Sequence, residues 1–330
     1  MVRPAKPVGY MIFLFLAGVL VYSNAIGHPF VHDDVVFIQN NPHIAQLDGF
    51  GDVFFKPSVA GSSVSAVNPY YRPLLELVYR LEYRLFGFNP YGFHLINILI
   101  HALNGILVFL LFSSLGMASL TAFAGALLFL VHPIQTEAVA CIAGISNLMF
   151  AFFLLVSINC YIWSRQCTSP SGGILWGVSL GTLLLAMFAK EQAVIGPFLF
   201  LFYELFDARR KIVKLSERLK PLAGVFLVGI FYFIIHGVMA GGMAASVLEN
   251  TAELKLRLLT IPKILLTYLG IFIAPVHLHY YRSVDILGPC VLAFAALGII
   301  TVKIPSLRSA SISSLSISTG IITEREKLPQ

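Results

Sequence analysis

Two adjacent aspartates, Asp33 and Asp34, directly follow the first long apolar run of the chain. Charged residues are costly inside a bilayer, so acidic groups gathered at its edge are candidates for function. One carboxylate of such a pair can take a proton from a nucleophile while its neighbour orients it or shifts its pKa. Carboxylate oxygens also suit a divalent metal, and His32 beside them is either a further ligand or a helix-end residue. The plainer alternative is a pair of turn residues in a solvated loop.

Three basic residues are candidates for holding an anion, namely Arg72, Lys190 and Arg282. A phosphate carried by a lipid at the bilayer edge is bound by side chains of this kind. Each has a plainer alternative as an interfacial anchor whose charge reaches out to water. Lys190 is followed by Glu191, so these two residues alternatively form a local ion pair.

Further polar residues accompany these groups. A helical stripe carries His94, Asn97, His101 and Asn104. Such a stripe is more typical of a buried seam of interhelical hydrogen bonds than of catalysis. His132 and Glu137 flank a turn at Pro133. Either they line a site, or Pro133 makes the turn and Glu137 favours the positive end of the next helix.

The composition is that of an integral membrane protein. Of the 330 residues, 58% are hydrophobic and only 12% are charged, about half the charged fraction of a soluble domain. Much of the net charge of +6 gathers at 209–220, which indicates a cytoplasmic loop under the positive-inside rule rather than nucleic-acid binding. The four cysteines have no metal-ligand spacing and imply no disulfide framework.

Apolar runs predict about eight or nine spans at roughly 20 residues per crossing. With the N-terminus in the cytoplasm, Arg165 and the segment 207–220 return there, as the positive-inside rule requires. The polar motifs at 32–34, 132–137 and 190–192 then all face outward. The segment 258–275 either crosses or lies along the outer face, and we favour the second. The runs are 8–26, 93–115, 117–131, 138–163, 172–189, 192–206, 221–240 and 287–304.

The first outer loop, 27–92, is too long to be a simple connection. Near its end, Pro73 suits the first turn of a helix and Gly87 suits its stop. Leucines at helical spacing on one face and charges on another predict an amphipathic helix at the membrane surface. The chain is thus expected to form one transmembrane domain, 1–304, followed by a disordered or truncated tail, 305–330.

Taken in order, these motifs resemble those of the transmembrane and tetratricopeptide-repeat-containing O-mannosyltransferases. The resemblance covers about 22–206. It is carried by His32-Asp33-Asp34-Val35, Tyr71-Arg72-Pro73-Leu74, Asn89-Pro90-Tyr91-Gly92-Phe93-His94, Asn97-Ile98-Leu99-Ile100-His101, His132-Pro133-Ile134-Gln135-Thr136-Glu137 and Lys190-Glu191-Gln192.

The resemblance implies a GT-C-like bundle that moves a sugar, mannose in this family, from a polyprenyl or dolichyl phosphate to a protein hydroxyl on the non-cytoplasmic face. It assigns Asp33 as the base and Asp34 as its support, with no metal and no cofactor. The implied partners are the lipid-linked donor, the acceptor protein and the bilayer. Arg72, Lys190 and Arg282 would hold the donor phosphate. The supporting residues are His32, His94, His132, Glu137 and Glu191.

Two departures from the family pattern keep other functions open. Gly144-Ile145-Ser146-Asn147-Leu148 stands where the family commonly has Gly-Arg-x-Asp-Leu, and the repeat array is missing. These departures favour an inactive membrane scaffold as one alternative. A transporter or lipid flippase is another, although that class typically has two related halves. The short chain without repeats predicts a bacterial inner membrane rather than the endoplasmic reticulum, with the site facing outward.

Overall fold

The computed structural model describes residues 7–45, 50–55, 71–167, 169–206, 214–239 and 251–275. Helices make up the regular structure of these residues, with no strand among them. The longer helices are α1 (Pro7–Tyr22), α3 (Pro73–Phe86), α4 (Pro90–Ser114), α5 (Ser119–Val131), α7 (Ile145–Gln166), α8 (Ser171–Ala189), α9 (Gly196–Phe206), α11 (Leu222–Met239) and α13 (Thr251–Ile273). Short helices are α2 (Pro42–Ala45), α6 (Thr136–Ala140) and α10 (Leu215–Leu219).

The chain is an all-α polytopic membrane protein. Within the described ranges, 5 helical segments are long and apolar enough to cross a membrane. They are Pro7–Gly27, Pro90–Ser114, Ile142–Gln166, Ser171–Ala189 and Leu215–Met239. The pair Ser119–Val131 and Pro133–Ala140 would add one more span, bent by 47°. The total of eight or nine spans stays a prediction, because the run 287–304 and the tail 305–330 lie outside the described residues.

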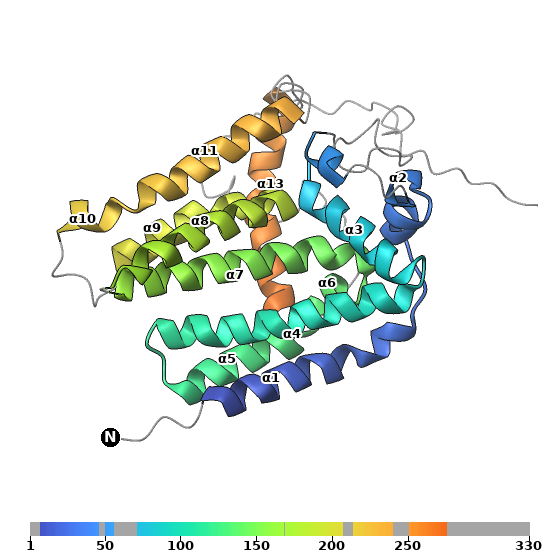
Figure 1. Ribbon diagram of the computed structural model, residues 1–330, viewed down its shortest axis with the longest axis horizontal. Helices are drawn as coiled ribbons and strands as arrows, with labels where there is room; N and C mark the ends of the chain where they lie inside the picture. Colours follow the sequence, from blue (N-terminus) through green and yellow to red (C-terminus); the bar gives the residue numbers. More distant parts are fainter. Residues whose placement is uncertain are drawn as a thin grey trace, which may run out of the picture.

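The long helices lie side by side, with α4 at the centre of one group. Helix α4 contacts α1, α5 and α7, and α7 in turn contacts α8. Figure 1 shows the start of α1 and helix α10 at one end of this bundle, and α2, α3 and α6 at the other. The polar motifs at 32–34, 132–137 and 190–192 belong to this second end, as the alternation of helix directions predicted.

The polar stripe of α4 is the predicted seam. Asn97 donates to three backbone carbonyls of the turn between α6 and α7, including that of Cys141 at 2.9 Å. Asn104 donates to the Leu148 carbonyl at 3.0 Å, and His101 bonds with the Leu130 carbonyl at 3.0 Å. The bonds to Leu130 and Cys141 pair carbonyls that are left free where a helix ends. The bonds from Asn97 also fix the turn that forms one wall of the cavity described below.

Helix α3 has the predicted limits, beginning at Pro73 and ending before Gly87, whose φ of 60° is the left-handed conformation that glycine tolerates. Its leucine face is open, with Leu81 and Leu85 exposed, as a membrane-facing helix requires. Part of the charged face is buried rather than solvated, because Glu76 and Arg80 form an ion pair of 2.5 Å inside the protein, whereas Arg84 is exposed. The sequence pattern thus predicted the helix and its apolar face but not the burial of its charges.

Helix α13 runs across the direction of α4 and α7 rather than along it (Figure 1). Its last turn lies at the end of α5, where His132 Nε2 bonds with the Phe272 carbonyl at 2.9 Å and the two rings stack 5.2 Å apart. The favoured prediction that 258–275 lies along the outer face stays a prediction. Arg282 lies outside the described residues.

Asp34 joins the first outer loop to the bundle. Its side chain is fully buried, and it accepts from the Ala143 N–H at 2.6 Å and from the Val31 N–H at 3.1 Å. The Cys141 thiol donates to it at 3.5 Å. Hydrogen bonds to a buried carboxylate are among the stronger contacts in proteins. Asp34 is therefore a structural anchor between the loop and the turn before α7.

Replacing Asp34 by asparagine is expected to destabilise the protein. One of the two backbone N–H groups would then face the amide NH₂, leaving a buried donor unpaired, with a loss of about 1.5–3 kcal/mol in unfolding free energy. Thermal unfolding in detergent measures this. The matched control is Asp33→Asn, which removes the same charge one residue away and leaves both backbone bonds of Asp34 in place. Equal melting temperatures for the two variants would contradict the anchor.

Cys167 tests the orientation of the bundle. It follows α7 at the same end as the start of α1, and hydrogen bonds with the Ser169 and Ser171 hydroxyls lower the pKa of its thiol to about 7. The thiolate is the reactive form. A membrane-impermeant maleimide is expected to label it only from the cytoplasmic side, and Cys167→Ser should abolish that labelling. Labelling in sealed vesicles that expose the opposite side would reverse the predicted orientation.

Candidate active site

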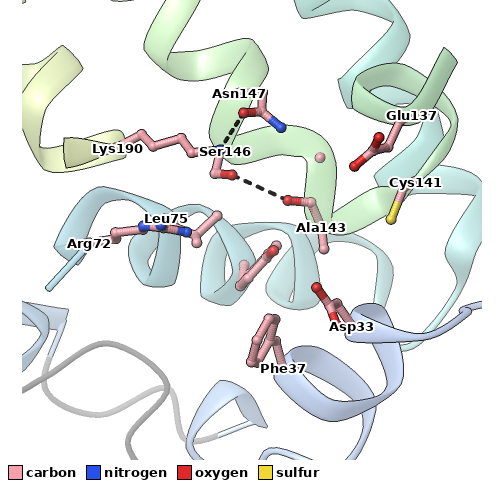
Figure 2. A pocket seen from close by; sticks show the side chains of 12 residues that line it. Asp33, Phe37, Arg72, Leu75, Glu137, Cys141, Ala143, Ser146, Asn147 and Lys190 are labelled. Atoms are coloured by element: carbon pink, nitrogen blue, oxygen red, sulfur yellow. Dashed lines mark hydrogen bonds between the residues drawn. The ribbon is translucent and has the colours of Figure 1, made fainter. Parts of the chain in front are cut away.

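A cavity of about 180 Å³ lies at the end of the bundle that carries the polar motifs. Its walls come from the first outer loop, α3, the α6–α7 region and the turn after α8 (Figure 2). Among the predicted site residues, Asp33, Arg72, Glu137 and Lys190 line it together. Segments that are far apart in the sequence thus contribute side chains to one cavity.

The cavity has an acidic side and a cationic side. Figure 2 shows Asp33 and Glu137 toward one side, and Arg72 and Lys190 toward the other, with Leu75 on the wall that joins them. A carboxylate can accept a proton, and paired cations can bind an anionic oxygen group. This chamber is therefore suited to a substrate that has a hydroxyl at one end and a phosphate at the other.

Asp33 enters the cavity because of the conformation around it. His32, directly before it, has a φ of 46°, a left-handed conformation that is uncommon for residues other than glycine. Asp34, directly after it, is fixed to Ala143 and Val31. The chain is thus held on both sides of Asp33, and the two adjacent aspartates point to different surroundings.

Arg72 and Glu191 form a bidentate ion pair. Arg72 Nε donates to Oε2 at 2.8 Å and Nη2 donates to Oε1 at 2.6 Å. Burial alone raises the pKa of the Glu191 carboxyl, but the hydrogen bonds and charge of Arg72 outweigh burial and lower that pKa. Glu191 therefore stays ionised and sets the direction of the Arg72 guanidinium beside the cavity. The predicted local pair between Lys190 and Glu191 is replaced by this longer-range one.

Lys190 faces the cavity from the end of α8. Its ammonium donates to Asn147 Oδ1, as Figure 2 shows. Burial and, after it, the positive charge of Arg72 lower the pKa of Lys190. Two neighbouring cations repel each other, and a bound anion relieves this repulsion. The electrostatics of this side thus favour a phosphate.

The other predicted site residues that the structure describes do not line this cavity. His94 bonds with the His28 carbonyl at 3.1 Å, and His132 caps the turn at Pro133 by accepting from the Ile134 N–H at 3.2 Å. His132 also holds α13, as described above. Among the described residues no group of acidic, histidine or cysteine side chains has the arrangement of a metal site.

Several cavity residues were not singled out in the sequence. Phe37, Leu75, Tyr79, Cys141 and Ser146 belong to this set. Cys141 was judged uninformative, but it lines the cavity and donates to Asp34, and burial with that carboxylate raises its pKa to about 12. The one available signal was spacing, since Arg72, Leu75 and Tyr79 follow one another by three and four residues and so share a helical face.

Comparison with known proteins gives several relatives named as protein O-mannosyl-transferases. Protein O-mannosyl-transferase TMTC1 of Mus musculus is 33% identical over 64% of this chain and 24% of its own length. Protein O-mannosyl-transferase TMTC2 of the same species is 35% identical over 54% of this chain and 22% of its length. TMTC4 of Homo sapiens is 31% identical over 53% of this chain and 26% of its length.

The chain spans about a quarter of the length of these curated relatives. No family model matches the chain, and no solved structure matches it. The relatives are vertebrate proteins, so they give no support to the predicted bacterial inner membrane. Over more than half of its length, the chain is thus similar to the protein O-mannosyl-transferases TMTC1 to TMTC4.

Proposed function

We propose that this chain is a membrane glycosyltransferase that moves a mannose from a polyprenyl or dolichyl phosphate to a protein hydroxyl on the non-cytoplasmic face. The observation that carries the proposal is that Asp33, Arg72 and Lys190 line one cavity at the end of a membrane-helix bundle. The names of the relatives agree with this reaction class. The GT-C type, the donor and the sidedness rest on the resemblance of the motifs.

In the proposed reaction, the acceptor hydroxyl attacks the anomeric carbon of the sugar. The new bond joins the acceptor oxygen to that carbon, and the bond between the carbon and the phosphate oxygen breaks with its electron pair leaving on the phosphate. Asp33 takes the proton of the hydroxyl as general base. No covalent enzyme intermediate is required, so a single displacement inverts the anomeric centre, as the family likeness implies.

Arg72 and Lys190 would stabilise the leaving phosphate as its negative charge grows. Such stabilisation is often a large part of catalysis, because the donors are positioned before the reaction begins. Glu191 and Asn147 hold these two cations in place. Asp34 would only position its neighbour Asp33, because its own carboxylate already accepts hydrogen bonds from two backbone N–H groups.

The two alternatives differ from the transferase in what they require. A transporter needs an ion or substrate site near the bilayer midplane, whereas this cavity lies at one end of the bundle. An inactive scaffold is favoured by Ile145 and Asn147, where the family commonly has charged residues. A direct assay separates the scaffold from the transferase.

Asp33→Asn tests the base. Membranes with the parent protein should transfer radiolabelled mannose from polyprenyl-phosphate mannose to protein, and Asp33→Asn should lower the rate about 10²-fold or more, the usual contribution of a general base. The variant should keep the melting temperature of the parent. Equal incorporation by both proteins would remove Asp33 from the mechanism. Failure of the parent to incorporate mannose would favour the scaffold.

The pH dependence of the rate in Lys190→Arg tests whether Lys190 binds the donor phosphate. Because the pKa of Lys190 is lowered, the lysine loses its charge at a lower pH than an ordinary lysine. At limiting donor, the parent rate should therefore fall as pH rises through that lowered pKa. Lys190→Arg keeps its charge, so its alkaline fall should move to higher pH.

The control for this experiment is Lys190→Gln, which has no charge at any pH. It should weaken donor use about 10-fold to 100-fold, as expected for the loss of a hydrogen bond to a charged group, and should lose the part of the alkaline fall that Lys190 causes. If Lys190→Arg and the parent have the same alkaline profile, Lys190 does not hold the phosphate.

A further inference from the structure

Tyr79 lines the cavity, and nothing in the proposed reaction uses it. The side chain is 3% exposed, and its hydroxyl has no hydrogen-bond partner among the residues that the structure describes. Leaving a buried hydroxyl unpaired costs free energy, and native proteins rarely keep such a group without a reason. An oxygen that enters the cavity with the substrate would supply the missing acceptor.

Tyr79 lies about two turns along α3 from Arg72, and both residues line the cavity. Arg72, Leu75 and Tyr79 share one face of α3 and its entry, and all three line the cavity. At about 1.5 Å per residue, Tyr79 is displaced by roughly 10 Å along the helix from Arg72. Asp34, which adjoins Asp33, and Arg72 both act electrostatically on its hydroxyl. The phenol is therefore further from the phosphate side than Arg72 is.

The protonation state of the Tyr79 hydroxyl limits the roles that it can have. Burial raises the pKa of Tyr79 well above its ordinary value. The hydroxyl thus stays protonated at neutral pH, where it can donate a hydrogen bond but cannot serve as a base or a nucleophile. The phosphate already has two cationic partners in Arg72 and Lys190. Between the phosphate and the base at Asp33, the proposed reaction places the sugar.

We propose that the Tyr79 hydroxyl donates a hydrogen bond to a hydroxyl oxygen of the sugar that is being transferred. This inference rests on the proposed function, and it makes Tyr79 a substrate-binding residue that selects for a particular sugar hydroxyl. A site built to bond a substrate hydroxyl rejects an analogue that lacks it, because a buried polar group is then left unpaired.

The test is Tyr79→Phe, which removes only the hydroxyl, with Tyr83→Phe as the matched control. Tyr83 is one turn further along α3, half-buried, with its ring 4.6 Å from that of Phe88, and it does not line the cavity. We expect Tyr79→Phe to lower kcat/KM for polyprenyl-phosphate mannose about twofold to tenfold, the effect of one hydrogen bond. The KM for the acceptor should not change, and Tyr83→Phe should match the parent.

Two further measurements separate binding from structure. The melting temperature without substrate should not fall in Tyr79→Phe, because the hydroxyl has no protein partner to lose. The second measurement uses a set of donors that each lack a different sugar hydroxyl. For the donor that lacks the hydroxyl bound by Tyr79, the parent and Tyr79→Phe should have equal rates, because neither can form the hydrogen bond.

The outcomes distinguish this inference from the proposed function. Turnover by the parent with an unchanged kcat/KM in Tyr79→Phe overturns the inference and leaves the transferase intact. A lowered melting temperature assigns the hydroxyl to the fold, and a changed acceptor KM assigns it to the other substrate; either result also overturns the inference. If the parent has no turnover, both proposals fail together.

Discussion

The hydrogen bond from the Ala143 N–H to Asp34 joins segments that are 109 residues apart in the sequence, and the rest of the cavity depends on this contact. The part of the loop around Asp34, residues 28–45, has only short helical turns, so without an anchor it would be free to leave the bundle. Ala143 belongs to the turn before α7, and Asn97 of α4 donates a hydrogen bond to the Cys141 carbonyl of the same turn. Loop, turn and central helix thus form one connected unit, and Asp33 owes its place in the cavity to that unit.

The cationic side is assembled in a similar way by contacts that are distant in sequence. Arg72 and Glu191 are 119 residues apart, and Lys190 and Asn147 are 43 residues apart. Long side chains lose conformational freedom when they are fixed, so a cation that is already held loses less when a ligand arrives. Holding Arg72 and Lys190 in advance therefore suits an anion site that must be ready before the chemical step.

The sequence was sufficient for features that depend on local pattern. Apolar runs located the long helices, and Pro73 with Gly87 gave the limits of α3. The alternation of spans also brought Asp33 and Lys190 to the same end of the bundle. Properties that depend on partners from other segments could not be found in this way. The burial of Glu76 with Arg80, the anchoring role of Asp34 and the place of Tyr79 all follow from packing, which periodicity does not encode.

The departure at Asn147 changes the charge of the site rather than its shape. An aspartate at this position, which the family commonly has, would form an ion pair with the Lys190 ammonium and neutralise it. Asn147 instead accepts a hydrogen bond through a neutral amide oxygen, so the lysine is held in position without a negative partner at residue 147. Ile145, where an arginine is common in the family, is fully buried in an apolar cluster with Leu75, Tyr79 and Met149. The charge lost at position 145 is thus replaced by packing behind the cavity wall, and the charge lost at position 147 makes the cationic side more attractive to a phosphate. The two substitutions therefore do not argue against anion binding in this chain.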